Sequence, residues 1–148
     1  FTGRRLYLTN FTGEKRLDLE KPEWFDVIVT TSMFGHIIAD LGAMLQGGLG
    51  IAAGGHIHPG QVSMFEPVHG SIPKYAGKNI ACPVAAIGAV GMLLDHIGER
   101  RAARLVDMAI ESLLVERKVT SLSTDSGLST DRVGSMMLEE MKRLEKTL

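Results

Sequence analysis

The sequence predicts an α/β fold. A run rich in β-branched residues at 25–30 leads directly into a helical pattern, and the second half of the chain joins a long loop to three helical patterns. With 148 residues, of which 45% are hydrophobic and 22% charged, the chain is long enough to bury the core of an ordinary domain.

Composition excludes several partner classes. The 16 basic and 17 acidic residues leave no positive surplus for nucleic acid. The apolar stretch 82–94 contains Gly88 and Gly91 and is shorter than the roughly 20 residues that cross a bilayer. Cys82, the single cysteine, forms no internal disulfide, which fits a reducing compartment. We therefore expect a cytoplasmic protein without membrane or nucleic-acid partners. Because a strand pattern follows Phe1 almost at once, we also expect a further segment before it.

The first third of the chain predicts two strands and a helix. Strands are expected at 4–9 and 25–30, separated by a polar stretch at 10–23. Thr30, Thr31 and Ser32 offer caps for a helix over 33–46 that Gly47 and Gly48 terminate. Its apolar positions fall at helical spacing and predict one apolar face: Phe34, Ile37, Ile38, Leu41, Met44 and Leu45.

The glycine-rich stretch 50–60 marks a joint between two structural units and forms a loop or a brief strand. A short strand is expected at 62–65, followed by a long loop at 66–81. Pro83 suits the first position of a helix. Three helices are expected, at 83–97, 100–117 and 129–144.

The loop 66–79 carries the strongest chemical signal. Gly70 and Gly77 can adopt backbone angles that expose N–H groups, and Lys74 and Lys78 supply positive charge. This combination predicts a site for a phosphorylated ligand. An ordinary surface loop is the alternative.

Two other clusters could bind metal. His36 and Asp40 are four residues apart on one helix face, which suits a shared ion or a solvated polar pair. Asp40 lies beside apolar positions and so requires a partner. His56 and His58 lack a second spaced ligand pair, so loop polarity explains them better than structural zinc.

Three blocks resemble the isocitrate and isopropylmalate dehydrogenase family. The first runs from Phe25-Asp26-Val27-Ile28-Val29-Thr30 to Asp40. The second begins Phe65-Glu66-Pro67-Val68-His69-Gly70-Ser71, a highly specific motif, and ends at Asn79. The third runs from Ala81-Cys82-Pro83 to Leu94.

The resemblance implies the C-terminal portion of that family's fold. Residues 1–49 would end the central domain that dimerises and binds substrate, and residues 50–148 would close the dinucleotide-binding domain. The implied reaction oxidises a 2-hydroxy acid such as 3-isopropylmalate and removes its β-carboxylate, with NAD or NADP and Mg²⁺ or Mn²⁺. A homodimer is implied, and the family's catalytic tyrosine, lysine and substrate arginines are not in this portion.

The resemblance also assigns residues. Asp40 matches a metal ligand, and His36 is the second, altered candidate. The cofactor-binding candidates are Glu66, His69, Gly70, Ser71, Lys74, Tyr75 and Asn79. Lys74 and Tyr75 resemble the pair that binds the extra phosphate of NADP, which slightly favours NADP, although relatives similar to isopropylmalate dehydrogenase also carry this pair and leave NAD open.

Departures from the family pattern keep other functions open. The family has aspartate where this chain has His36, and imidazole suits softer metals than Mg²⁺. Asparagines of the family are replaced by Ser32 and Cys82, and its Val-Asp pattern is missing from 10–23. The alternatives are activity on isocitrate, tartrate or homoisocitrate, or a non-catalytic remnant that serves as a binding or dimerisation module.

Overall fold

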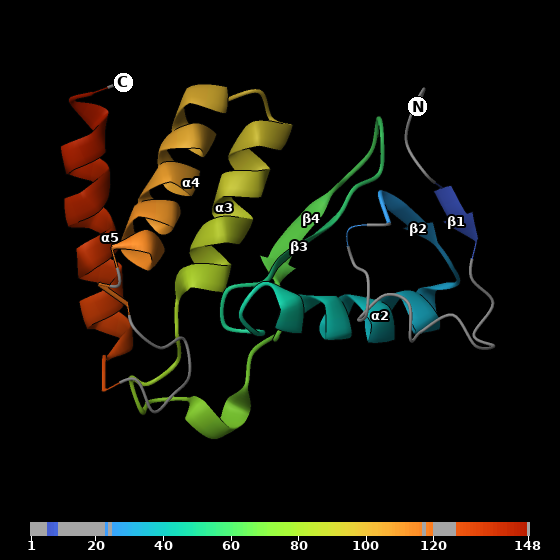
Figure 1. Cartoon of the computed structure of the whole chain (residues 1–148), viewed down its shortest axis with the longest axis horizontal. Helices are drawn as coiled ribbons and strands as arrows, with labels where there is room; N and C mark the ends of the chain where they lie inside the picture. The colour runs from blue at the N-terminus through green and yellow to red at the C-terminus, as the bar shows by residue number, and fades with distance from the viewer. Residues whose placement is uncertain (1–5, 9–22, 24, 117, 120–126, 148) are drawn as a thin grey trace. The chain divides into compact units, whose positions relative to one another are not determined.

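A computed structural model describes residues 6–8, 23, 25–116, 118–119 and 127–147 (Figure 1). The chain divides into two compact units, 1–46 and 47–148. The elements are β1 (Leu6–Leu8), β2 (Val27–Val29), α2 (Ser32–Leu45), β3 (Ala53–His56), β4 (Met64–Pro67), the 3-10 helix η2 (Pro73–Tyr75), α3 (Val84–His96), α4 (Arg100–Val115) and α5 (Thr130–Glu145). This combination of strands and helices confirms the predicted α/β class.

The first unit contains a parallel strand pair followed by a helix. β1 pairs with β2 in the register Leu6↔Val27 to Leu8↔Val29, so both predicted strands are confirmed, in shorter form. Thr31 is the N-cap of α2, but its side chain makes no capping hydrogen bond, so the prediction of side-chain capping is wrong there. Residues 10–22, where we noted the missing Val-Asp pattern, lie outside the described residues.

The apolar pattern of α2 is only partly covered. Ala43 is the helix's buried residue. Five large apolar side chains along α2 are between 40% and 64% exposed: Met33, Ile37, Leu41, Met44 and Leu45. The helix prediction is therefore confirmed, while most of its apolar face stays accessible.

The second unit begins with an antiparallel hairpin. β3 pairs with β4 from Ala53↔Pro67 to His56↔Met64, which confirms a brief strand within 50–60. The strand expected at 62–65 instead occupies 64–67, and Val62 lies in the connection before it, 90% exposed. Glu66 and Pro67, expected in the loop, thus belong to the end of β4.

One face of the hairpin packs against α3. A Cβ at Gly55 would lie 3.1 Å from the Phe65 ring and 3.3 Å from the Met92 methyl, so glycine is needed for this close approach. The Phe65 and His96 rings are 5.3 Å apart. Packing against α3 therefore fixes the position of the end of β4, where the loop begins.

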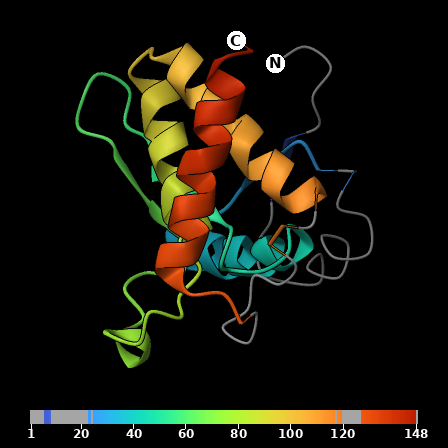
Figure 2. The same cartoon turned by 90° about the vertical axis from the view of Figure 1, so that its left-hand side faces the viewer.

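Helices α3, α4 and α5 lie side by side, as Figures 1 and 2 show from two directions, with α4 packing against both others. Their boundaries match the predicted helices to within two residues. Buried residues from these helices and their connections form the core: Val84, Ala109, Leu113, Val119, Val133, Met137 and Leu144. None of the described helices is long and apolar enough to span a membrane.

The inner face of α5 also buries a charge that the pattern did not predict. Val133 and Met137 are buried, and Glu140 on the same face is only 4% exposed. A buried carboxylate needs compensating partners. Arg143 and Lys118 form ion pairs with it, and Ser112 on α4 donates a hydrogen bond of 2.7 Å.

Candidate cofactor site

The loop from β4 to α3 is built from successive tight turns. Gly70 N–H donates to the Pro67 carbonyl at 3.1 Å, and Tyr75 N–H and Lys78 N–H donate at 3.0 Å to carbonyls three residues earlier. Gly70 and Gly77 have φ values of +65° and +72°, with open space where a Cβ would lie. Glycine is thus required by backbone conformation at these two positions.

The loop has N–H groups that are available to a ligand, two of them beside or at its positive-φ glycines. Within the described residues, the N–H groups of Ser71 and Gly77 donate no hydrogen bond, and both residues are exposed. Exposed N–H groups next to positive-φ glycines form concavities that bind anions. The backbone geometry is of this kind, and the phosphate site itself stays a prediction.

His69 is held by its own turn. Its Nδ1 lies 2.6 Å from the Gly70 carbonyl oxygen, so Nδ1 carries the hydrogen and donates it. This assignment follows from the acceptor, since a carbonyl cannot donate. In the neutral ring Nε2 is then an acceptor, suited to a hydroxyl or amino group of a ligand.

The positive charges of the loop are accessible. Lys74 Nζ lies 4.8 Å from the centre of the Tyr75 ring, a cation–π contact that orients the ammonium group. In the described part of the chain, neither Lys74 nor Lys78 forms an ion pair with a carboxylate, and both are exposed. Their charges remain available to an anion.

Glu66 lies where the loop begins, across the hairpin from a histidine. His56 Nε2 is 3.5 Å from Glu66 Oε1, and the two side chains are 55% and 47% exposed. A pair this exposed contributes little to stability. The structure thus leaves the Glu66 carboxylate accessible at the entrance to the loop.

Asn79, a cofactor-binding candidate by resemblance, lies beside the start of α5. Its φ is +56°, and its amide group faces the first turn of α5. Asn79 Nδ2 donates to Asp131 Oδ2 at 2.9 Å, and Asp131 N–H donates to Asn79 Oδ1 at 3.1 Å. Both polar atoms of its side chain are engaged, so the side chain joins the loop to α5.

Sequence reasoning missed Thr130 and Asp131 as members of this site. Thr130 N–H donates to the Asn79 carbonyl at 3.0 Å, and Thr130 Oγ1 donates to the Ala81 carbonyl at 2.6 Å. The sequence marked both as the start of a helix. It gave no signal that this start meets a loop about fifty residues earlier.

The end of the loop is anchored in the core. Cys82 packs against the buried cluster, and burial raises the pKa of its thiol, a change opposed by a backbone hydrogen bond with Val84. Ala85 N–H donates to the Gly50 carbonyl at 3.1 Å. The thiol therefore stays protonated and acts as a small packing group.

The metal candidates lie apart from the loop in sequence, on α2. His36 and Asp40 are both exposed and one helical turn apart. Among the described residues, no group of three or more His, Cys, Asp or Glu side chains could hold a metal ion. This chain's described residues do not complete a metal site, so the assignment of Asp40 stays a prediction.

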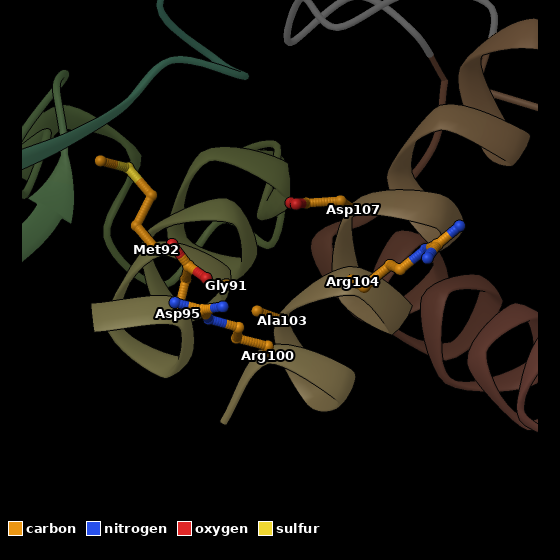
Figure 3. A pocket seen from close by; sticks show the side chains of 7 residues that line it. All are labelled: Gly91, Met92, Asp95, Arg100, Ala103, Arg104 and Asp107. Atoms are coloured by element: carbon orange, nitrogen blue, oxygen red, sulfur yellow. The ribbon is translucent and has the colours of Figure 1, made fainter. Parts of the chain in front are cut away.

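A separate cavity of about 240 Å³ lies between α3 and α4 (Figure 3). It is lined by Gly91, Met92, Asp95, Arg100, Ala103, Arg104 and Asp107. Figure 3 shows Arg104 extending away from Asp95 and Arg100. None of the predicted cofactor residues lines this cavity, so it is distinct from the loop site.

Solved dehydrogenases share this fold. Isocitrate dehydrogenase from Methylococcus capsulatus aligns with a TM-score of 0.79 and 39% identity, over 86% of this chain and 38% of that one. A β-decarboxylating dehydrogenase from Thermococcus kodakarensis aligns with a TM-score of 0.74 and 32% identity, over 89% of this chain and 39% of that one. The fold is therefore that of part of an α/β dehydrogenase.

The sequence model of the isocitrate/isopropylmalate dehydrogenase family matches residues 16–137, and the chain belongs to this family. It is 47% identical over 107 residues to 3-isopropylmalate dehydrogenase of Frankia casuarinae, covering 71% of this chain and 31% of the relative. It is 44% identical over 124 residues to isocitrate/homoisocitrate dehydrogenase of Thermus thermophilus, covering 84% of this chain and 36% of the relative. The chain thus spans about a third of these relatives' length, and it belongs to a family of oxidoreductases.

Proposed function

We propose that this chain forms the cofactor-binding part of an NAD(P)-dependent, β-decarboxylating dehydrogenase. The observation that carries the proposal is the loop 66–79, which combines accessible N–H groups with two lysines that form no ion pair with a carboxylate among the described residues. The substrate would be a 2-hydroxy acid such as 3-isopropylmalate. The relatives' names also include isocitrate and homoisocitrate, so the choice among these acids remains part of the proposal.

Each loop group has a specific role in this proposal. The N–H groups of Ser71 and Gly77 bind phosphate oxygens, and Lys74 and Lys78 neutralise phosphate charge. His69 Nε2 accepts a hydrogen bond from the adenosine end of the cofactor. Lys74, held over Tyr75, gives a slight preference for the extra phosphate of NADP.

A divalent ion, when bound, lowers the pKa of the substrate hydroxyl and stabilises the enolate formed on decarboxylation. In this chain Asp40 would supply an oxygen ligand. His36 would supply an imidazole, which favours Mn²⁺ over Mg²⁺ at the same position. Within the described part of one chain, these two side chains are not joined by a third candidate ligand.

Fluorescence titration with NADPH and NADH tests the proposal. We expect saturable binding by the chain, and we expect Lys74→Asp to weaken NADPH about tenfold or more, because it replaces a phosphate-binding cation with an anion. NADH, which lacks that phosphate, should be less affected. Lys142→Asp, the same charge change at an exposed site in the last turn of α5, is the matched control.

Two outcomes would count against this assignment. Equal weakening of NADPH and NADH by Lys74→Asp would refute the phosphate role of Lys74. If the unsubstituted chain bound neither nucleotide, the proposed function would fall.

A non-catalytic binding module, favoured by His36 where the family has aspartate, would bind nucleotide without turnover. Dehydrogenase assays with 3-isopropylmalate, isocitrate, tartrate and homoisocitrate, using Mg²⁺ or Mn²⁺, distinguish that case.

Homodimer formation is the second part of the proposal. It is supported by the exposed apolar side chains of α2, of which Met44 is 63% and Ile37 40% exposed. Burying such side chains favours association by about 25 cal/mol per Å² of apolar surface. Light scattering should give twice the mass of one chain, and Ile37→Lys should lower it. A monomeric unsubstituted chain would contradict the dimer.

A further inference from the structure

The beginning of α5 is capped from a distant part of the chain. The first N–H groups of a helix have no partner within the helix. In α5 the Thr130 and Asp131 N–H groups donate to the carbonyl and the Oδ1 of Asn79, at 3.0 and 3.1 Å. Ser129 Oγ caps the next one, accepting from Arg132 N–H at 3.2 Å.

The contact is reciprocal, because α5 also fixes Asn79. Asp131 Oδ2 accepts from Asn79 Nδ2 at 2.9 Å, and its negative charge strengthens that bond. With both ends of the amide bonded, the side chain has one orientation. Residue 79 is held in the left-handed conformation, φ +56°, which asparagine tolerates better than most residues.

This contact lies close to the groups that we assign to phosphate binding. Asn79 directly follows Lys78 and is two residues from Gly77, whose N–H group is available. The Lys78 N–H group is already used, bonding to the Tyr75 carbonyl at 3.0 Å. The orientation of the backbone at Asn79 therefore sets where the Gly77 N–H group and the Lys78 ammonium group point.

We propose that Asp131 is a positioning residue for the cofactor. Through Asn79 it fixes the end of the loop, and through the loop it fixes the groups that bind phosphate, although it does not itself touch the ligand. This inference rests on the proposed function and extends the site to the N-terminus of α5. It also implies that cofactor binding and the docking of α5 stabilise each other.

Binding titrations with NADPH and with 2′,5′-ADP test this role in the full chain. Asp131→Ala removes the bond to Asn79 Nδ2 while leaving the backbone bonds in place. Asp131→Asn keeps an acceptor oxygen there. Asn79→Gly removes this bond from the other side, together with the Oδ1 acceptor of the Asp131 N–H group, and keeps the positive φ accessible. Glu139→Gln, at an exposed position further along α5, is the matched control.

We expect Asp131→Ala to weaken both ligands about tenfold, as loss of one charge-assisted hydrogen bond would do. Asp131→Asn should recover most of the affinity, and Glu139→Gln should bind normally. The double variant Asn79→Gly/Asp131→Ala should bind no more weakly than the weaker single variant, because Asn79→Gly already removes the bond that Asp131→Ala removes. Circular dichroism below the melting temperature checks that each variant is folded.

A purely structural role would give a different result. If Asp131→Ala lowered the melting temperature but bound both ligands as tightly as the unsubstituted chain, the positioning role would be overturned while the proposed function stood. Additive losses in the double variant would also overturn it. If the unsubstituted chain bound neither ligand, the proposed function and this inference would fall together.

Discussion

Substitution of Glu140 by glutamine should measurably destabilise the second unit. The carboxylate is buried between α4 and α5 and receives bonds from Arg143, Ser112 and Lys118, which together lower its pKa from 4.5 to about 2. Arg143 makes the largest contribution; its Nε lies 3.0 Å from Oε1. Ser112 Oγ lies 2.7 Å from Oε1 and Lys118 Nζ 3.1 Å from Oε2.

The size of the effect follows from that pKa. A shift of this extent corresponds to about 3 kcal/mol of the free energy of unfolding at neutral pH, as an upper bound. The Lys118 and Arg143 side chains are 40% and 55% exposed, so water screens their attraction and solvates them after the substitution. Glu116 also remains paired with Lys118, at 2.6 Å. We therefore expect Glu140→Gln to cost about 2 kcal/mol rather than the larger penalty of a stranded buried charge.

The pH dependence gives the effect a signature. Because the folded-state pKa is lowered, the stabilisation is complete above the unfolded-state pKa near 4.5 and is lost as pH falls toward 2. Urea unfolding followed by circular dichroism, from pH 7 to pH 2.5, should show the variant and the unsubstituted chain converging at low pH. Glu139→Gln, the exposed neighbour, serves as control. A difference that is below about 0.5 kcal/mol at pH 7, or constant with pH, would refute the reasoning.

Three further substitutions test the packing and capping of the helices. Gly91→Ala should destabilise the chain by about 1 kcal/mol, because its Cβ would lie 3.2 Å from buried Val106, whereas Gly134→Ala, with open space around its Cβ, should stabilise α5 by about 0.5–1 kcal/mol. Thermal unfolding compares the two variants, and a stabilising Gly91→Ala would show that the side chains between α3 and α4 can move to make room for a methyl group. Ser129→Ala removes the side-chain cap of α5 and should lower the free energy of unfolding by about 1 kcal/mol in urea. An unchanged urea midpoint would show that Asn79 alone is a sufficient cap.

Local patterns predicted most of the helices and strands correctly. Helical spacing of apolar residues identified α2 to α5, and Ser129 marked the start of α5 because capping depends on a few adjacent residues. The position of β4 was less accurate. Val62 suits a strand as well as Phe65 does, and only pairing with β3 decides that residues 64–67 form it.

The missed parts of the site depend on contacts distant in sequence. Asn79 and Asp131 are separated by 52 residues. Neither the loop sequence around Asn79 nor the helix start around Asp131 predicts that the two residues meet. Glu140 falls at a core position of α5, where a pattern of apolar residues assigns no charge. Its burial becomes understandable only once Ser112 and Lys118, from α4 and its connection, are placed beside it.

Binding of NADP followed by NMR tests the central claim most directly. Amide chemical shifts of the assigned chain would be recorded during a titration. We expect saturable changes concentrated at Ser71, Lys74, Gly77 and their neighbours, with smaller changes at Asp131. The absence of saturable changes, or changes confined to the cavity lined by Asp95 and Asp107, would contradict a cofactor site in the loop 66–79.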